Sequence, residues 1–111
     1  MDFTVIQENG TAVVKTNVDK LNASNASELK AELVLVNKKS VNNIIIDMSK
    51  TSYCDSSGLS AILVANRLCK DTNGTFVLCG LNPNVFKLIQ IAQLDKVLTI
   101  TDSSEEALAL I

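Results

Sequence analysis

Three consecutive isoleucines, Ile44–Ile46, constrain the fold of this chain more than any other feature of its sequence. A continuous β-branched run, without the alternation of a half-exposed strand, is typical of a central strand covered on both faces. Apolar residues at helical spacing before it predict an amphipathic helix over 25–38. A second apolar segment after it predicts a capped helix over 59–70. A buried strand between two helices indicates an α/β fold.

The remaining segments continue this alternation of strand and helix. A β-hairpin opens the chain, because Asn9-Gly10 is a strong turn signal between strand-like runs at 3–7 and 11–15. Further strands are predicted at 75–79 and 97–101. Helix-capping residues stand at Asn25, at Asn82 before Pro83, and at Ser103 with Glu106 as a capping box. The predicted order is therefore ββαβαβαβα: one domain over 1–111, with a mixed β-sheet opened by a hairpin and about four helices packed on it.

Charge and hydropathy exclude several classes of protein. The chain has 111 residues, of which 47% are hydrophobic and 20% charged, so it can bury about two-thirds of its surface and is not disordered. The chain has ten basic and twelve acidic residues, so it does not have the excess of positive charge by which many proteins bind nucleic acids. Asp2 and Glu8 leave no room for a signal peptide, and no apolar stretch reaches the ~18 residues of a membrane helix. We expect a cytoplasmic protein that does not engage a membrane.

The residue types that commonly carry catalysis are missing or scattered. The chain has no histidine, which excludes a Ser-His-Asp triad, an HExxH zinc site and a Cys-His nucleophile. Its three cysteines show no CxxC spacing, so we expect buried thiols in a reducing cytosol. Asp47 and Asp55 could be considered as an acidic pair, but no companion lysine or glycine-rich phosphate loop has matching spacing. We therefore expect no enzyme, no metal and no cofactor.

One segment, Asp55-Ser56-Ser57-Gly58, is unusual, and it lies between the central strand and the start of a helix. It has two interpretations. In the first, Asp55 and the serines cap the helix and glycine relaxes the turn. In the second, the Ser56 hydroxyl lies where backbone N–H groups and the helix dipole favour an anion, so that a phosphoryl group would find a site there, although Asp55 would repel it. The residues alone leave both open.

The stretch from Asp55 to Leu59 resembles the signature loop of STAS domains, specifically the bacterial anti-sigma factor antagonists. Further matches span almost the whole chain: Val18-Asp19, Ile45-Ile46-Asp47, Gly80-Leu81-Asn82-Pro83 and Glu105-Glu106-Ala107-Leu108. Two departures precede the first helix, where Thr16 replaces the usual glycine and Asn17 the usual acidic residue. Ser60 stands where many relatives have glycine or alanine. The resemblance implies the STAS fold.

The resemblance also implies a phosphorylation switch. Ser56 would be phosphorylated by an anti-sigma factor that is itself a serine kinase; Ser57 is by position the weaker candidate. The unmodified form would bind that anti-sigma factor and free a sigma factor, and a serine phosphatase would reset the switch. We expect a monomer when free. The expected partner-binding residues are Asp19, Asp55, Ser57, Gly58, Val64 and Arg67.

Two expectations concern the helix after Ser56 and the class of the protein. Leu59, Ile62 and Leu63 are expected to pack on the sheet, which leaves Val64 and Arg67 exposed beside Ser56 as a docking surface. The alternative function is that of a small STAS subunit of a lipid-transport ABC complex, which binds its ATPase without a phosphorylation cycle. Both uses share the fold and the loop.

Overall fold

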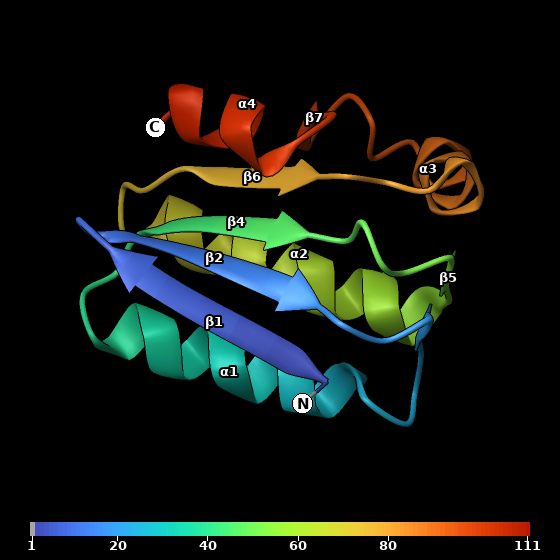
Figure 1. Cartoon of the computed structure of the whole chain (residues 1–111), viewed down its shortest axis with the longest axis horizontal. Helices are drawn as coiled ribbons and strands as arrows, with labels where there is room; N and C mark the ends of the chain where they lie inside the picture. Colours follow the sequence, from blue (N-terminus) through green and yellow to red (C-terminus); the bar gives the residue numbers. More distant parts are fainter. Residues whose placement is uncertain (1) are drawn as a thin grey trace.

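The computed structural model describes residues 2–111, and within that range the chain forms a five-stranded sheet, a two-stranded sheet and four helices (Figure 1). The strands are β1 (Phe3–Glu8), β2 (Thr11–Thr16), β3 (Lys20–Leu21), β4 (Asn43–Asp47), β5 (Tyr53–Cys54), β6 (Phe76–Cys79) and β7 (Thr99–Thr101). The helices are α1 (Ala26–Lys38), α2 (Ser56–Asp71), α3 (Pro83–Ile91) and α4 (Ser104–Ala109). The predicted elements are all present, and β3 and β5 are additional.

The larger sheet has the order β1-β2-β4-β6-β7. β1 pairs with β2 antiparallel, as the hairpin requires, and every later pairing is parallel. The sheet is therefore mixed, as predicted. The carboxyl ends of β2, β4 and β6 lie at one end of the molecule, together with β5, the start of α2, and α3 (Figure 1). In open α/β sheets, this end is where functional sites collect.

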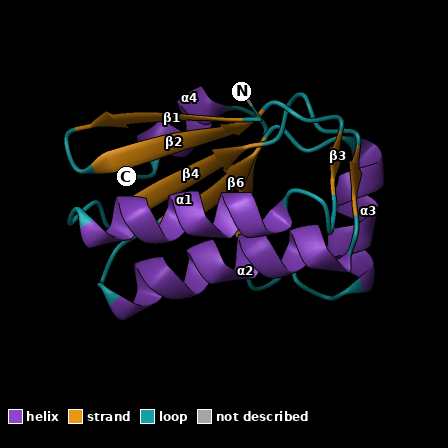
Figure 2. Cartoon of the chain, turned by 90° about the horizontal axis from the view of Figure 1, so that it is seen from below, coloured by secondary structure: helices purple, strands orange, loops and turns teal. Residues whose placement is uncertain are grey.

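Helices cover both faces of the sheet unequally. α1 and α2 lie side by side against one face, α4 lies on the other, and α3 lies beyond the end of the strands (Figure 2). Ile44 and Ile46 belong to the main core, whereas Ile45 packs in a smaller cluster with Val77, Cys79 and Ala107 of α4. All three isoleucines are fully buried. The prediction of a central strand covered on both faces is confirmed.

The predicted caps have mixed outcomes. Asn82 accepts a hydrogen bond from the Asn84 N–H at 2.8 Å, as expected for an N-cap before proline. Asn25 occupies the cap position of α1, but its side chain accepts from the Asn22 N–H at 3.0 Å and donates to the Lys20 carbonyl at 2.9 Å. The expectation that it caps the helix with its side chain was wrong, because the preceding turn takes both of its polar atoms.

The capping box at α4 is half formed. The Glu106 N–H donates to Ser103 Oγ at 3.2 Å, as predicted. The return bond does not go to the N–H of Ser103, since the Glu106 carboxylate accepts from the Asp102 N–H at 3.1 Å. This longer reach closes the turn that leads from β7 into the helix.

One packing prediction for α2 was also wrong. Leu63 is 36% exposed, although it was expected to lie on the sheet. The buried positions of the helix are Gly58, Ala61, Ile62, Ala65 and Cys69. These follow the i, i+3, i+4, i+7 pattern of one helix face, and Leu63 falls outside that stripe.

Candidate functional site

The Asp55 side chain caps α2 and leaves Ser56 exposed. Its Oδ1 accepts hydrogen bonds from the N–H groups of Ser57, at 2.9 Å, and Gly58, at 3.1 Å. These are two of the N–H groups that the first turn of a helix leaves without a backbone acceptor. Ser56 is the first residue of the helix and lies on its solvent side, whereas Ser57 is half-buried. The capping interpretation holds for Asp55, and it leaves the Ser56 hydroxyl accessible.

Gly58 is buried and permits a close approach between α2 and β3. A Cβ at this position would lie 2.6 Å from the Leu21 carbonyl oxygen and 2.7 Å from Cys54 Sγ. Real Cβ contacts essentially never fall below 3.0 Å, so only glycine lets the first turn of the helix reach this position. The structure thus gives Gly58 a packing role; its expected contact with a partner stays a prediction.

The small sheet formed by β3 and β5 anchors the start of α2. Lys20 pairs with Tyr53 and Leu21 with Cys54, and the Asp55 N–H continues the ladder to the Leu21 carbonyl at 3.2 Å. The sequence did not predict either strand. Because each is only two residues long, neither carries a periodic pattern that could have revealed it.

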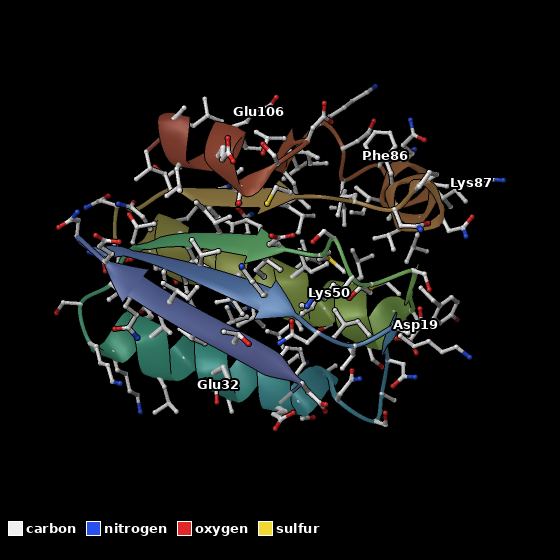
Figure 3. All side chains as sticks on the ribbon, viewed as in Figure 1. Asp19, Glu32, Lys50, Phe86, Lys87 and Glu106 are labelled. Atoms are coloured by element: carbon white, nitrogen blue, oxygen red, sulfur yellow. The ribbon has the colours of Figure 1, made fainter. Side chains whose placement is uncertain are left out.

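Asp19 lies at this same anchor. Its carboxylate accepts a hydrogen bond from the Ser52 hydroxyl, and its carbonyl accepts from the N–H groups of Ser52, at 2.9 Å, and Tyr53, at 3.1 Å. Figure 3 shows Asp19 at the end of the molecule that also carries Lys87 of α3. The structure therefore brings Asp19 to the segment that leads into Ser56.

A buried pair of hydroxyls stabilises the loop where the sequence departs from the STAS pattern. Thr16 and Thr51 are each 1% exposed, and their Oγ1 atoms lie 2.7 Å apart. Thr51 Oγ1 also donates to the Val18 carbonyl at 2.7 Å. Asn17 donates from its side chain to Thr4 Oγ1 at 2.7 Å. Threonine in place of glycine thus joins the end of β2 to the loop between β4 and β5.

The expected docking residues of α2 do not all lie beside Ser56. Arg67 is exposed and Val64 is half-buried, and Arg67 shares the exposed face with Ser56, Ser60 and Leu63. At 1.5 Å per residue, however, Val64 lies about 12 Å and Arg67 about 17 Å along the helix from Ser56. The expectation that both are adjacent to Ser56 was wrong in this respect.

A hollow beside Ser56 contains residues that the sequence analysis missed. Its volume is about 540 Å³, and it lies between the start of α2 and α3. The lining residues are Tyr53, Cys54, Asp55, Ser56, Asn84, Lys87, Leu88 and Ile91. Ile91 could have been recognised in the sequence, because it falls outside the apolar stripe that Val85, Leu88 and Ile89 form.

The three thiols are buried and free, as expected. The pKa of Cys54 is raised from 9.0 to about 12, mainly because the thiol is buried and to a smaller extent because the negative charge of Asp55 is close by. The pKa of Cys79 is raised to about 12, mainly by burial and to a smaller extent by the negative charge of Asp47. Burial raises the pKa of Cys69 to about 11. Because a thiolate is the reactive form, the native thiols are poor nucleophiles at neutral pH.

Residues 2–111 contain neither a cluster of metal ligands nor a membrane-spanning helix. In that range no three His, Cys, Asp or Glu side chains gather as they would around a metal ion. The Asp47 carboxylate accepts a hydrogen bond from the Ser49 N–H at 2.9 Å, and the Asp55 carboxylate accepts from the Ser57 N–H as the N-cap of α2. None of the helices described is both long enough and apolar enough to cross a bilayer.

Comparisons with known proteins agree with this geometry. The family model of the STAS domain matches residues 3–107. Over 89 residues, the chain is 29% identical to BtrV of Bordetella bronchiseptica, a protein named as an anti-sigma factor antagonist; the match covers 80% of this chain and 77% of BtrV.

Solved structures share the same fold. A Thermotoga maritima protein named as an anti-sigma factor antagonist matches with a TM-score of 0.91 at 24% identity, over 98% of this chain and 93% of that one. The phosphorylated form of the Bacillus cell fate determinant SpoIIAA matches with a TM-score of 0.76 at 20% identity, over 98% and 99% of the two chains. The mixed sheet and four helices are thus those of known STAS-domain structures.

Proposed function

The chain belongs to the STAS domain family, and on that premise we propose that it is an anti-sigma factor antagonist. In its unmodified form it binds an anti-sigma factor with serine kinase activity, and a sigma factor is released. Phosphorylation of Ser56 ends this binding, and a serine phosphatase restores it. The role is that of an interaction switch in the cytoplasm and involves no catalysis by this chain. BtrV and the Thermotoga maritima protein support the proposal because they are named as anti-sigma factor antagonists, and SpoIIAA supports it because its matching structure is a phosphorylated form.

The observation that carries the proposal is the exposed Ser56 directly after the capping Asp55. A phosphoryl group there adds about −1.5 to −2 charge. Asp55 already occupies the N–H groups of Ser57 and Gly58, so these donors are not free to neutralise it. A partner that covers this surface would meet an uncompensated dianion. Repulsion and desolvation then cost about 2–4 kcal/mol, which weakens the affinity roughly 30- to 1,000-fold.

The test begins with capture from native lysate by the wild type and by the Ser56→Ala and Ser56→Asp variants, followed by titration calorimetry with the purified partner. A Ser40→Asp variant is the matched control. Ser40 is exposed, follows α1 at the opposite end of the molecule from the start of α2 (Figure 1), and has a positive φ of 65° that aspartate tolerates. We expect tight binding by wild type, Ser56→Ala and Ser40→Asp, and loss of binding by Ser56→Asp.

Two results would contradict the proposal. If Ser56→Asp binds the partner as tightly as wild type, Ser56 is not the switch. If every bait recovers a transporter ATPase, the chain is the subunit of a lipid-transport complex instead. With the purified kinase and ATP, Ser56→Ala should abolish phosphoryl incorporation, whereas Ser57→Ala should retain it.

A further inference from the structure

We propose that the hollow between α2 and α3 is the anchor pocket for the anti-sigma factor. It takes one large apolar side chain of the partner, flanked by a carboxylate that pairs with Lys87. The inference rests on the proposed function, which supplies the partner, and extends the interface from the Ser56 loop to α3. Its volume of about 540 Å³ lies within the roughly 300–1,000 Å³ of pockets that enclose drug-sized ligands, so it has room for a side chain of leucine to phenylalanine size together with the flanking carboxylate.

The walls of the hollow expose apolar surface that the fold itself does not use. Ile91 is 71% exposed and Tyr53 is 49% exposed, and they line the hollow together with the half-buried Leu88. Ile91 has the largest exposed fraction among the large exposed hydrophobic residues of 2–111. Apolar and aromatic residues gathered around a concavity are characteristic of the centre of a protein–protein interface.

Charge specifies what accompanies the apolar side chain. Lys87 is the only cation that lines the hollow, and it is the only charged residue of α3. Asp55 lies on the wall formed by the start of α2. An acidic residue of the partner is therefore attracted to the α3 side and repelled from the α2 side, which orients the partner's segment across the hollow.

The same geometry explains how one modification can end binding. Ser56 lines the hollow, so a phosphoryl group would place a dianion in the wall against which the partner's apolar side chain packs. Burial of apolar surface against an unpaired dianion is costly. No change of fold is needed.

Tyr53 provides a direct probe, because it is the only tyrosine in the chain. Protein labelled with 3-fluorotyrosine gives one ¹⁹F resonance, which reports on the wall of the hollow. The labelled chain is titrated with the purified, unlabelled anti-sigma factor kinase, and its affinity is measured by calorimetry. Ile91→Ala and Lys87→Ala change exposed residues, and Leu35→Ala, at a leucine of α1 that is 54% exposed, is the matched control.

We expect the ¹⁹F resonance to shift on binding. Ile91→Ala should weaken the affinity about tenfold, from the buried methyl and methylene groups that it removes. Lys87→Ala should weaken it up to about fivefold, and Leu35→Ala should leave it unchanged. If the kinase binds and Ser56→Asp abolishes binding, but the resonance and the Ile91→Ala affinity do not change, the anchor pocket is wrong and the proposed function stands. If the kinase does not bind wild type at all, both are overturned.

Discussion

Replacement of Gly58 by alanine tests whether the start of α2 is set by close packing on β3. The new Cβ would lie 2.6 Å from the Leu21 carbonyl oxygen, 2.7 Å from Cys54 Sγ and 2.9 Å from Leu21 Cγ. Leu21 is fully buried, Cys54 is 6% exposed, and the Leu21 carbonyl accepts the Asp55 N–H. These neighbours cannot move away without breaking the anchor, so each must shift by several tenths of an ångström together with the helix.

The expected cost follows from two opposing effects. Overpacking of a buried site destabilises a protein by about 1–3 kcal/mol. Alanine recovers up to about 1 kcal/mol, because it is a better helix former than glycine and reduces the entropy of the unfolded chain. We therefore expect Gly58→Ala to lower the free energy of unfolding by about 1–2 kcal/mol, measured by urea denaturation without a partner present.

Ser60→Ala is the control for this measurement. It changes an exposed residue one half-turn further along the same helix, and it should alter stability by no more than about 0.5 kcal/mol. If Gly58→Ala is as stable as wild type, the close approach does not constrain the fold. A contact with the partner would then be the better explanation for glycine at this position.

Two further predictions concern the buried polar and titratable groups. Thr51→Val removes the donor to the Val18 carbonyl and leaves the Thr16 hydroxyl with only the Asp47 carbonyl, at 3.4 Å, so it should cost about 1–3 kcal/mol in urea denaturation. Thr51→Ser keeps the hydroxyl and should cost about 1 kcal/mol. Equal stability of the two variants would refute the role of the hydroxyl pair. The raised pKa values of the thiols should make the free energy of unfolding fall as the pH rises from 9 towards 11, because the unfolded thiols ionise there while the folded ones keep their protons. Urea midpoints measured at pH 8, 9 and 10 check this, and a midpoint that rises over that interval would contradict it.

The elements that could be predicted are those whose side chains repeat with a regular period. The sequence predicts β4 from Ile44–Ile46 and α1 from its apolar stripe, because burial on one or both faces of an element imposes a regular pattern of apolar residues. β3 and β5 could not be predicted, because Lys20 pairs with Tyr53 across 33 residues and each strand contributes only two positions. The cap position of Asn25 was predicted, but its side-chain hydrogen bonds were not, since the side chain can bond either to the helix or to the preceding turn and only the folded loop decides between them.

The same distinction applies to the candidate site: its local part could be predicted from the sequence, and the part that depends on distant segments could not. The capping role of Asp55 and the place of Ser56 at the start of α2 could be predicted, because the tetrapeptide that contains them is local. The hollow depends instead on how α3 lies against β5, two elements about 30 residues apart in the chain. Ile91 gave a sequence signal only as an apolar residue outside the stripe of its helix, and such residues are common on protein surfaces. What makes this one informative is that it faces the same hollow as the predicted acceptor serine.

The position of Asp55 also decides what a phosphoryl group can do here. At many helix starts, free N–H groups would bind a phosphate and stabilise the modified form. In this chain the carboxylate of Asp55 accepts from the N–H groups of Ser57 and Gly58, and Ser56 precedes both of these donors. The N-terminus of the helix would therefore stabilise a phosphoryl group on Ser56 only a little. The main effect of its charge would be repulsion of a partner that covers Ser56. Under the proposed function, phosphorylation of Ser56 would therefore act on the partner and leave the fold of the chain unchanged.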